Sequence, residues 1–363
     1  MEVNSMADHE TRNKDAEAVL RNYAVKTYHI EYMGNITKLY SDKGVFALKS
    51  IDPHIGIDFI RNIQRLYQRG YNRIVPIYQT MDGRYAVLHN SRLYYLMPWL
   101  SDQEDGERSE RNKQMFRELA RMHALSVREI SVDQEEREEH YQTTLEEWKK
   151  QLEFLREFVE SCEKKWYMSP FELMYCTYYT DLSQALEYST KKLEEWYEKT
   201  KDHEKIRTVV THGKVSLKHY VYDDRGYGYF INFENSKTAP PHFDLLPYLV
   251  EAARTYPFPC DDCVDLLYNY MRYFPLKSEE VLLFQSYLAY PGSSISVVKG
   301  YFEKKGHRSE LQYVSHFQRQ YWLLKNIEYM VMKIEENERA KKAAAEAQQQ
   351  QEQEQQEQEQ NAE

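Results

Sequence analysis

The spacing of apolar residues along this chain changes near residue 110 from a strand-like to a helix-like period. It returns to the strand-like period in one later stretch. Before that residue, short apolar runs between turn residues predict strands, with one helix-like run, IDFIRNIQRLYQRG. After it, apolar residues recur at the helical period as far as about residue 338, except over residues 207–235, which are β-like. This pattern predicts an α+β protein with a small β-rich lobe followed by a large helical lobe.

Two turn signals organise the strand-like part. Asp42-Lys43-Gly44 separates YHIEYMGNITKLYS from GVFALKSI, and Met81-Asp82-Gly83 separates RIVPIYQT from RYAVLHN, so each predicts a hairpin. In the helix-like run, one face carries five apolar or aromatic residues, and Gly70 ends the run; the five are Phe59, Ile60, Ile63, Leu66 and Tyr67.

These signals divide the chain into four segments. We predict a helical lead-in over residues 1–24, an N-lobe over 25–101, a helical C-lobe over 102–335 with a β hairpin at 207–235, and a low-complexity Gln/Glu tail over 336–363. The tail is too polar to bury a face, so we expect it to be a solvated helix fragment or disordered.

Composition limits the class of protein. Hydrophobic residues make up 42% of the 363 residues, enough for a packed core, and the formal net charge of −10 argues against a nucleic-acid partner. No run approaches the roughly 20 apolar residues of a membrane span, and the polar N-terminus lacks a secretory signal, so we expect a soluble intracellular protein. The 32 tyrosines fit either core packing or a place in a packed or cross-linked assembly.

The cysteines predict no disulfide framework, because four cysteines in such a chain are too few for one. Cys260 and Cys263 form one CxxC, in PFPCDDCVDLL, without the further ligands that a structural zinc site needs. We predict two thiols at a helix start, where Asp261 and Asp262 favour the helix dipole, rather than a metal or redox site.

Short motifs add to this layout. FALK ends at Lys49 on the third predicted strand, and YLMPWL lies between the predicted lobes. THGK, KHYVY, FINFEN and PHFDLLPYL follow in and after the β-like stretch. In this order the motifs resemble the aminoglycoside phosphotransferase branch of the protein-kinase-like superfamily. Over about residues 25–330 the chain is most similar to its spore coat members, the CotS-like proteins of the YsxE and YutH type.

The resemblance implies a two-lobed kinase-like fold and a place in the coat of a Bacillus-like endospore. A protein of this kind would be made in the mother-cell cytoplasm and assembled into the spore coat, with other coat proteins as its partners. The sequence leaves its oligomeric state open.

The resemblance also assigns roles to particular residues. Lys49 matches the lysine that holds the nucleotide phosphates, Met97 and Trp99 lie in the linker that pairs with adenine, and Gly34 is the only glycine in the first strand turn. Asp244, in PHFDLLPYL, matches a buried structural aspartate.

The catalytic positions depart from the family pattern. Lys214 stands where the family has its catalytic carboxylate, and His219 and Asn232 stand where it has the metal-binding Asn and Asp. Phosphoryl transfer depends on metals that bridge the phosphates and on a carboxylate that accepts the substrate proton. Mg²⁺ prefers carboxylates and phosphates, so Asn232 is a weaker ligand.

Two expectations concern charged partners. The helix over residues 53–70 has no glutamate to pair with Lys49, so Asp58 or Gln64 is the candidate partner. Lys214 has two interpretations: it fills the vacant metal position and pairs with Glu234 or another acid, or it is simply exposed to solvent. We slightly favour the ion pair.

Three histidines are expected to be structural or to hold the loop. We predict that His212 and His123 are satisfied structural residues and that His219 hydrogen-bonds to Asn232 across the hairpin.

Three functions remain open from the sequence. The first is a spore coat scaffold, a pseudokinase that binds other proteins and needs no cofactor or metal. The second is a phosphotransferase that uses ATP and Mg²⁺ through rewired ligands. The third is a nucleotide-binding module without turnover.

Overall fold

The computed structural model describes residues 14–100, 107–304 and 308–360, and the chain divides into two compact units. The first comprises residues 1–130, 207–244 and 269–274, and the second the remainder. The first unit thus contains more than the predicted N-lobe, since residues 107–130 and the β-like stretch belong to it. Residues 1–13 of the predicted lead-in lie outside the described residues, and residues 14–20 are helical.

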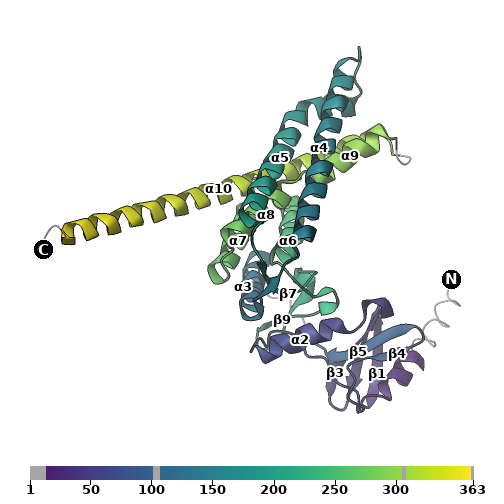
Figure 1. Ribbon diagram of the computed structural model, residues 1–363. Coiled ribbons are helices and arrows are strands. Elements are labelled where there is room, and N and C mark those ends of the chain that lie inside the picture. Colours follow the sequence, from purple (N-terminus) through teal and green to yellow (C-terminus); the bar gives the residue numbers. More distant parts are fainter. Residues whose placement is uncertain (1–13, 101–106, 305–307, 361–363) are drawn as a thin grey trace. The chain divides into compact units, whose positions relative to one another are not determined.

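A five-stranded antiparallel sheet forms the base of the first unit, in the order β1-β2-β3-β5-β4 (Figure 1). Its strands are β1 (Thr27–Met33), β2 (Ile36–Ser41), β3 (Gly44–Ile51), β4 (Val87–His89) and β5 (Arg92–Pro98). The predicted turn at Asp42 and Lys43 is confirmed, because Ser41 pairs with Gly44 across it.

The second predicted hairpin is wrong. The segment RIVPIYQT forms no strand and makes only isolated bridges, Ile74 with Phe230 and Tyr78 with Leu96. Instead β4 pairs with β5, through a turn whose two residues, Asn90 and Ser91, have φ values of 45° and 57°. Positive φ at both turn residues suits the twist of a two-residue hairpin, whereas Pro76 within RIVPIYQT cannot donate to a strand ladder.

Helix α2 (Asp58–Gln68) follows the predicted amphipathic pattern, with Phe59, Ile60, Ile63 and Leu66 buried. Phe59 packs on Tyr95 of β5 with ring centroids 5.7 Å apart, so the apolar face of α2 covers the sheet. At the opposite end of the helix, Gly70 has a φ of 80°, as a helix-ending glycine requires.

The rest of the first unit carries the β-like stretch. After α3 (Arg108–Ser126), the strands β6 (Arg128–Ser131), β7 (Lys205–Thr211) and β10 (Lys237–Ala239) form a small sheet, and β8 (Tyr220–Tyr222) pairs with β9 (Gly228–Phe230). Asp223 closes the β8–β9 turn by accepting hydrogen bonds from the backbone N–H groups of Arg225 and Tyr227.

The second unit is helical (Figure 1). It contains α4 (Gln134–Glu163), α5 (Pro170–Thr200), α8 (Ser278–Ala289), α9 (Gly292–Phe302), α10 (Glu310–Gln360) and most of α6 (His242–Thr255) and α7 (Asp261–Tyr273). Its core is rich in aromatic residues, including Trp148, Phe158 and Tyr175. Tyr178 and Tyr321 stack with ring centroids 3.6 Å apart, so tyrosine takes part in packing here.

Helix α10 is continuous over its whole length, and where the sequence left a choice between helix fragment and disorder, the structure has helix as far as Gln360. Alanine, glutamine and glutamate, which dominate the residues after Arg339, are good helix formers.

One segment has the length and apolarity of a membrane span. Among the described residues, this segment is Ser278–Phe302; an 18-residue window within it has a mean hydropathy of 1.2, but 61% of that window is buried inside the structure. The segment consists of two helices, α8 and α9, that are interrupted at Tyr290 and Pro291. Buried core helices of a globular protein have the same composition.

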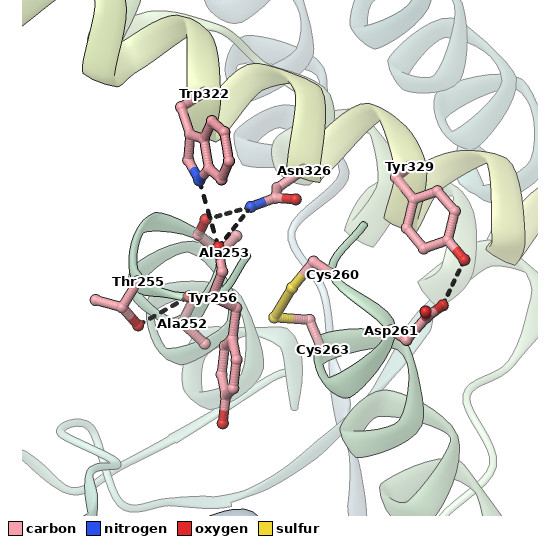
Figure 2. The surroundings of a disulfide bond; sticks show 10 residues. All are labelled: Ala252, Ala253, Thr255, Tyr256, Cys260, Asp261, Cys263, Trp322, Asn326 and Tyr329. Carbon is pink, nitrogen blue, oxygen red and sulfur yellow. Dashed lines mark hydrogen bonds between the residues drawn. A yellow bond between two sulfur atoms is a disulfide. The ribbon is translucent and has the colours of Figure 1, made fainter. Parts of the chain in front are cut away.

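The prediction of two thiols in the CxxC is wrong, because Cys260 and Cys263 form a disulfide (Figure 2). Both residues are buried, and their Cα atoms are 5.5 Å apart, within the range that a disulfide spans. Helix α7 begins at Asp261, as predicted. The number of cysteines indicates only whether a framework of several disulfides is present. It does not reveal a single local disulfide between two cysteines three residues apart.

Candidate functional site: a buried lysine cluster and the loop beside it

Lys49 lies in β3 between two neighbouring strands, and its side chain is buried. Its ammonium donates a hydrogen bond to Oδ1 of Asn232 at 2.6 Å and forms an ion pair with Oε1 of Glu234. Tyr95, the cross-strand neighbour of Lys49 on β5, donates its hydroxyl proton to the same carboxylate oxygen. One lysine thus joins the sheet to the segment that follows β9.

Burial and charge act against each other in this pair. Burial lowers the pKa of Lys49, and the negative charge of Glu234 offsets this only in part. For Glu234, burial would raise the pKa, but the charge of Lys49 and the hydrogen bonds from Lys49 and Tyr95 together lower it. The lowered pKa keeps Glu234 ionised at neutral pH, so the pair is an ammonium and a carboxylate.

The partners of Lys49 come from one short segment of unusual backbone. Asn232 has φ 66° and ψ 54°, the left-handed conformation that asparagine adopts more readily than most residues. The residues after it form a short 3₁₀ helix, η3 (Phe233–Asn235), with Phe233 buried. This reversal places the side chains of Asn232 and Glu234 on the same ammonium.

A second buried cluster centres on Asp244, at the start of α6. Its carboxylate accepts hydrogen bonds from the backbone N–H groups of His212 and Gly213, both at 2.7 Å. His123 of α3 contacts the same carboxylate through Nε2 at 3.1 Å, and its Nδ1 lies 2.6 Å from the hydroxyl of Tyr270. Burial would raise the pKa of Asp244, but His123 and the other contacts outweigh it and lower the pKa.

His212 is fully buried, and both of its ring nitrogens have backbone partners. The Nδ1 atom accepts from the N–H of Lys214 at 3.2 Å, so Nε2 carries the proton and donates it to the carbonyl of Ile231 at 2.7 Å. Burial lowers the pKa of His212, which keeps the imidazole neutral. The ring therefore ties the loop after β7 to the segment after β9 and has no free nitrogen for acid–base chemistry.

Gly213 allows the closest approach in this loop. Its φ is 79°, and a Cβ built on it would lie 2.2 Å from the carbonyl oxygen of Asn235. A side chain there would therefore force two backbone segments apart, so glycine is required for both conformation and space.

The charged residues of the loop do not have the partners that the sequence suggested. Lys214 is exposed, as the alternative interpretation has it, and Glu234 pairs with Lys49, so the favoured pair of Lys214 with Glu234 is wrong. The predicted bond between His219 and Asn232 is also wrong, since His219 Nδ1 lies 2.8 Å from the carbonyl of Lys214.

The two residues of α2 that we considered for Lys49 are engaged elsewhere. Asp58 is exposed and pairs with Arg61, and Gln64 donates to the hydroxyl of Tyr85 at 2.7 Å. Sequence reasoning therefore missed the Lys49–Glu234 pair. Its only signal was the glutamate two residues after Asn232 in FINFEN, a long way in sequence from β3.

The residues considered for nucleotide binding are spread along the sheet. Gly34 lies in the exposed two-residue turn between β1 and β2, and Met97 is buried in β5. The backbone N–H of Trp99 donates to the carbonyl of Val45 at 3.0 Å and is not free to pair with an adenine ring. The ammonium of Lys38 lies 4.8 Å from the centre of the Trp99 ring.

The arrangement does not fit a magnesium ion. Within the residues that the structure describes, no group of three or more His, Cys, Asp or Glu side chains is placed to hold a metal. Around Lys49, the oxygens of Asn232 and Glu234 converge, but on an ammonium. A divalent ion at this point would have to displace a buried lysine.

Comparison with known proteins identifies the family. Residues 56–261 match the phosphotransferase enzyme family APH, and the chain belongs to that family. No curated protein sequence matches the chain.

Solved structures show the kinase-like fold. An aminoglycoside phosphotransferase from Alicyclobacillus acidocaldarius is 14% identical with a TM-score of 0.65, and the alignment covers 88% of this chain and 95% of that one. The AMP-bound spectinomycin phosphotransferase APH(9)-Ia is 12% identical with a TM-score of 0.51, over 86% of this chain and 96% of that one. At these identities the likeness concerns the fold, which is the predicted α+β kinase-like fold.

Proposed function

We propose that this protein is a pseudokinase scaffold, which keeps the phosphotransferase fold and acts by binding other proteins. One observation carries the proposal: the ammonium of Lys49 is held by Asn232 and Glu234. By its resemblance to the family, Lys49 matches the lysine that holds the nucleotide phosphates, and Asn232 stands where the family has its metal-binding Asp. Here these groups satisfy one another, so the charges that would receive a nucleotide and its metal are used internally.

The position of the catalytic base supports the same proposal. Lys214 stands there in an exposed loop. An ammonium donates three protons and has no lone pair with which to accept one from a substrate hydroxyl. Removing one electrostatic group from an active site typically costs about 10²–10³ in rate, and here several positions differ together.

The biological setting proposed is the spore coat. The support is the resemblance of GVFALKSI, LYYLMPWL and the motifs around residues 211–247 to CotS-like proteins. The protein would be made in the mother-cell cytoplasm and assembled into the coat with other coat proteins as partners. It would need neither ATP nor Mg²⁺ for this role.

The test is thermal melting of the purified protein with ATP, ADP or GTP, each with and without Mg²⁺. A ligand that binds only the folded state raises the melting temperature. We expect no shift at millimolar nucleotide. A shift without Mg²⁺ would instead support a nucleotide-binding module, and it would overturn the part of the proposal that says the protein binds no nucleotide.

The second candidate is a small-molecule phosphotransferase, favoured by membership of an enzyme family. In that case Lys49 would leave Glu234 to bind phosphates, and the freed carboxylate could hold Mg²⁺. This candidate requires a melting shift that depends on Mg²⁺ and formation of ADP from ATP. Glu234→Gln should then abolish both, whereas the scaffold predicts that neither exists in the wild type.

A further inference from the structure

A basic hollow lies at the start of α10 in the second unit, with a volume of about 870 Å³. One side comes from the end of α6 and the other from the residues that begin α10. We call it the arginine groove; its lining comprises Arg254, Arg308, Leu311, Gln312, Ser315, His316, Arg319, Gln320 and Trp322.

The positive charge of the arginine groove is mostly uncompensated. Arg254 has an ion pair at 3.5 Å with Glu251, whose side chain is 74% exposed. No carboxylate in the described part of the chain lies within salt-bridge distance of Arg308 or Arg319, and both residues are exposed. In a protein of net charge −10, this leaves a local positive site open to solvent.

Two further observations define the ligand that would suit this groove. Arg308 Nη1 lies 3.5 Å from Nδ1 of His316, and burial, followed by the charges of Arg308, Arg319 and Arg254, lowers the pKa of His316. Trp322 is 47% exposed, with its Nε1 directed at the carbonyl of Tyr256 at 3.3 Å (Figure 2). The groove therefore offers an apolar ring beside its positive charge, a surface suited to an acidic peptide.

The chain itself contains such a peptide. Residues 343–363 hold no lysine or arginine and six glutamates, namely Glu346, Glu352, Glu354, Glu357, Glu359 and Glu363. Glutamines separate most of these charges, so the segment is acidic without an apolar stripe.

The acidic segment of a chain is kept away from the groove of the same chain. Arg319 and Glu352 lie on one uninterrupted helix, α10. At 1.5 Å per residue, the 33 residues between these positions correspond to about 50 Å of helix. Within one copy the two charged regions cannot meet unless α10 breaks.

We propose that the arginine groove binds the acidic segment, residues 343–363, of a second copy of this chain. The contact joins two different surfaces, so a pair of copies still has one free groove and one free acidic segment. Association of this kind continues from copy to copy. It does not depend on whether the Lys49 cluster binds nucleotide, because that cluster lies in the first unit.

Sedimentation velocity of the full chain tests the proposal. We expect association that increases with protein concentration at about 50 mM salt and is lost at about 500 mM, because exposed charges are screened. A monomer at low salt throughout the accessible concentration range would overturn it.

Matched variants identify the two surfaces. The tail variant Glu352→Gln, Glu354→Gln, Glu357→Gln, Glu359→Gln and the groove variant Arg308→Gln, Arg319→Gln should each weaken association at least about tenfold. As a charge control, the same exchange at four exposed glutamates of α4 should leave association unchanged; these are Glu135, Glu139, Glu153 and Glu157. Equal loss in the control would point to net charge and contradict the groove.

A charge swap separates this contact from binding of other anions. Arg308→Glu with Arg319→Glu should abolish association, and the further changes Glu352→Lys, Glu354→Lys, Glu357→Lys and Glu359→Lys in the same chain should restore it. A groove that instead binds a labelled single-stranded oligonucleotide, but not a labelled peptide of residues 343–363, would overturn the proposal in favour of a nucleic-acid site.

Discussion

The two buried polar clusters of the first unit differ in what supplies their hydrogen-bond donors. Around Asp244, two of the donors are backbone N–H groups, from His212 and Gly213, so the carboxylate holds the shape of a loop. Around Glu234, the donors are side chains, from Lys49 and Tyr95, so the carboxylate neutralises a charge.

This difference shows that loop shape and loop chemistry are separable. The Asp244 cluster needs nothing from a ligand, and it holds the loop after β7 in place whichever residue stands at position 214. In the proposed function, the Lys49 cluster uses internally the groups that would otherwise act on a ligand. The residues that hold this loop are therefore separate from the positions at which the sequence departs from the family pattern.

The largest effect is expected at the Asp244 cluster. Asp244→Ala leaves the backbone N–H groups of His212 and Gly213 without this acceptor and removes one of the two partners of His123, so we expect a loss of roughly 4 kcal/mol in the free energy of unfolding. Urea denaturation measures it. Asp265→Ala, at an exposed aspartate of α7, is the control and should cost little. A loss below about 1 kcal/mol at Asp244 would contradict the structural role.

The Lys49 cluster should respond differently to substitution. Lys49→Met leaves Glu234 buried without its cation, which should cost about 3 kcal/mol. Adding Glu234→Gln removes the uncompensated charge while keeping an acceptor for Tyr95, so the double variant should regain at least about 1 kcal/mol. Urea denaturation of the four proteins in the cycle gives the coupling energy. Additive losses would mean that the two residues do not act as a pair.

Lowering the pH should reduce the stability that the Lys49 cluster contributes, by a smaller amount than the Lys49→Met substitution does. The folded pKa of Glu234 is lower than its ordinary value of 4.5, so the unfolded chain binds this proton more readily. The stabilisation is complete above that value and is lost as pH falls through the folded pKa. Unfolding free energies measured from pH 6 down to about pH 3 should therefore fall less steeply for Glu234→Gln than for the wild type. Parallel curves would contradict the lowered pKa.

The smallest effect is expected at Lys214, the position that the resemblance matches to the catalytic carboxylate. Lys214 is exposed, so Lys214→Asp should change the free energy of unfolding by less than about 0.5 kcal/mol. Lys218→Asp, at another exposed lysine of the same stretch, is the matched control for charge. A loss of about 2 kcal/mol at Lys214 alone would show that its side chain holds the loop, and would weaken the distinction between shape and chemistry.

The fold could be predicted wherever a local pattern decides it. The buried face of α2 follows from helical spacing, and the turn between β2 and β3 follows from Asp42-Lys43-Gly44. For the site, the sequence indicates which positions to consider but not which side chains contact one another. Which acid pairs with Lys49 depends on how a distant segment turns at Asn232, and β4 depends on a turn at Asn90 and Ser91 that lacks glycine.

The continuity of α10 has a consequence for any array of these molecules. If the groove of one copy receives the acidic segment of the next, both contact points lie on the same rod, and the helix between them sets the repeat distance. Inserting seven residues after Lys342, close to two helical turns, should lengthen that repeat by about 10 Å while nearly preserving the rotational phase. The number of residues between Arg319 and Glu352 would then determine the repeat distance of the array.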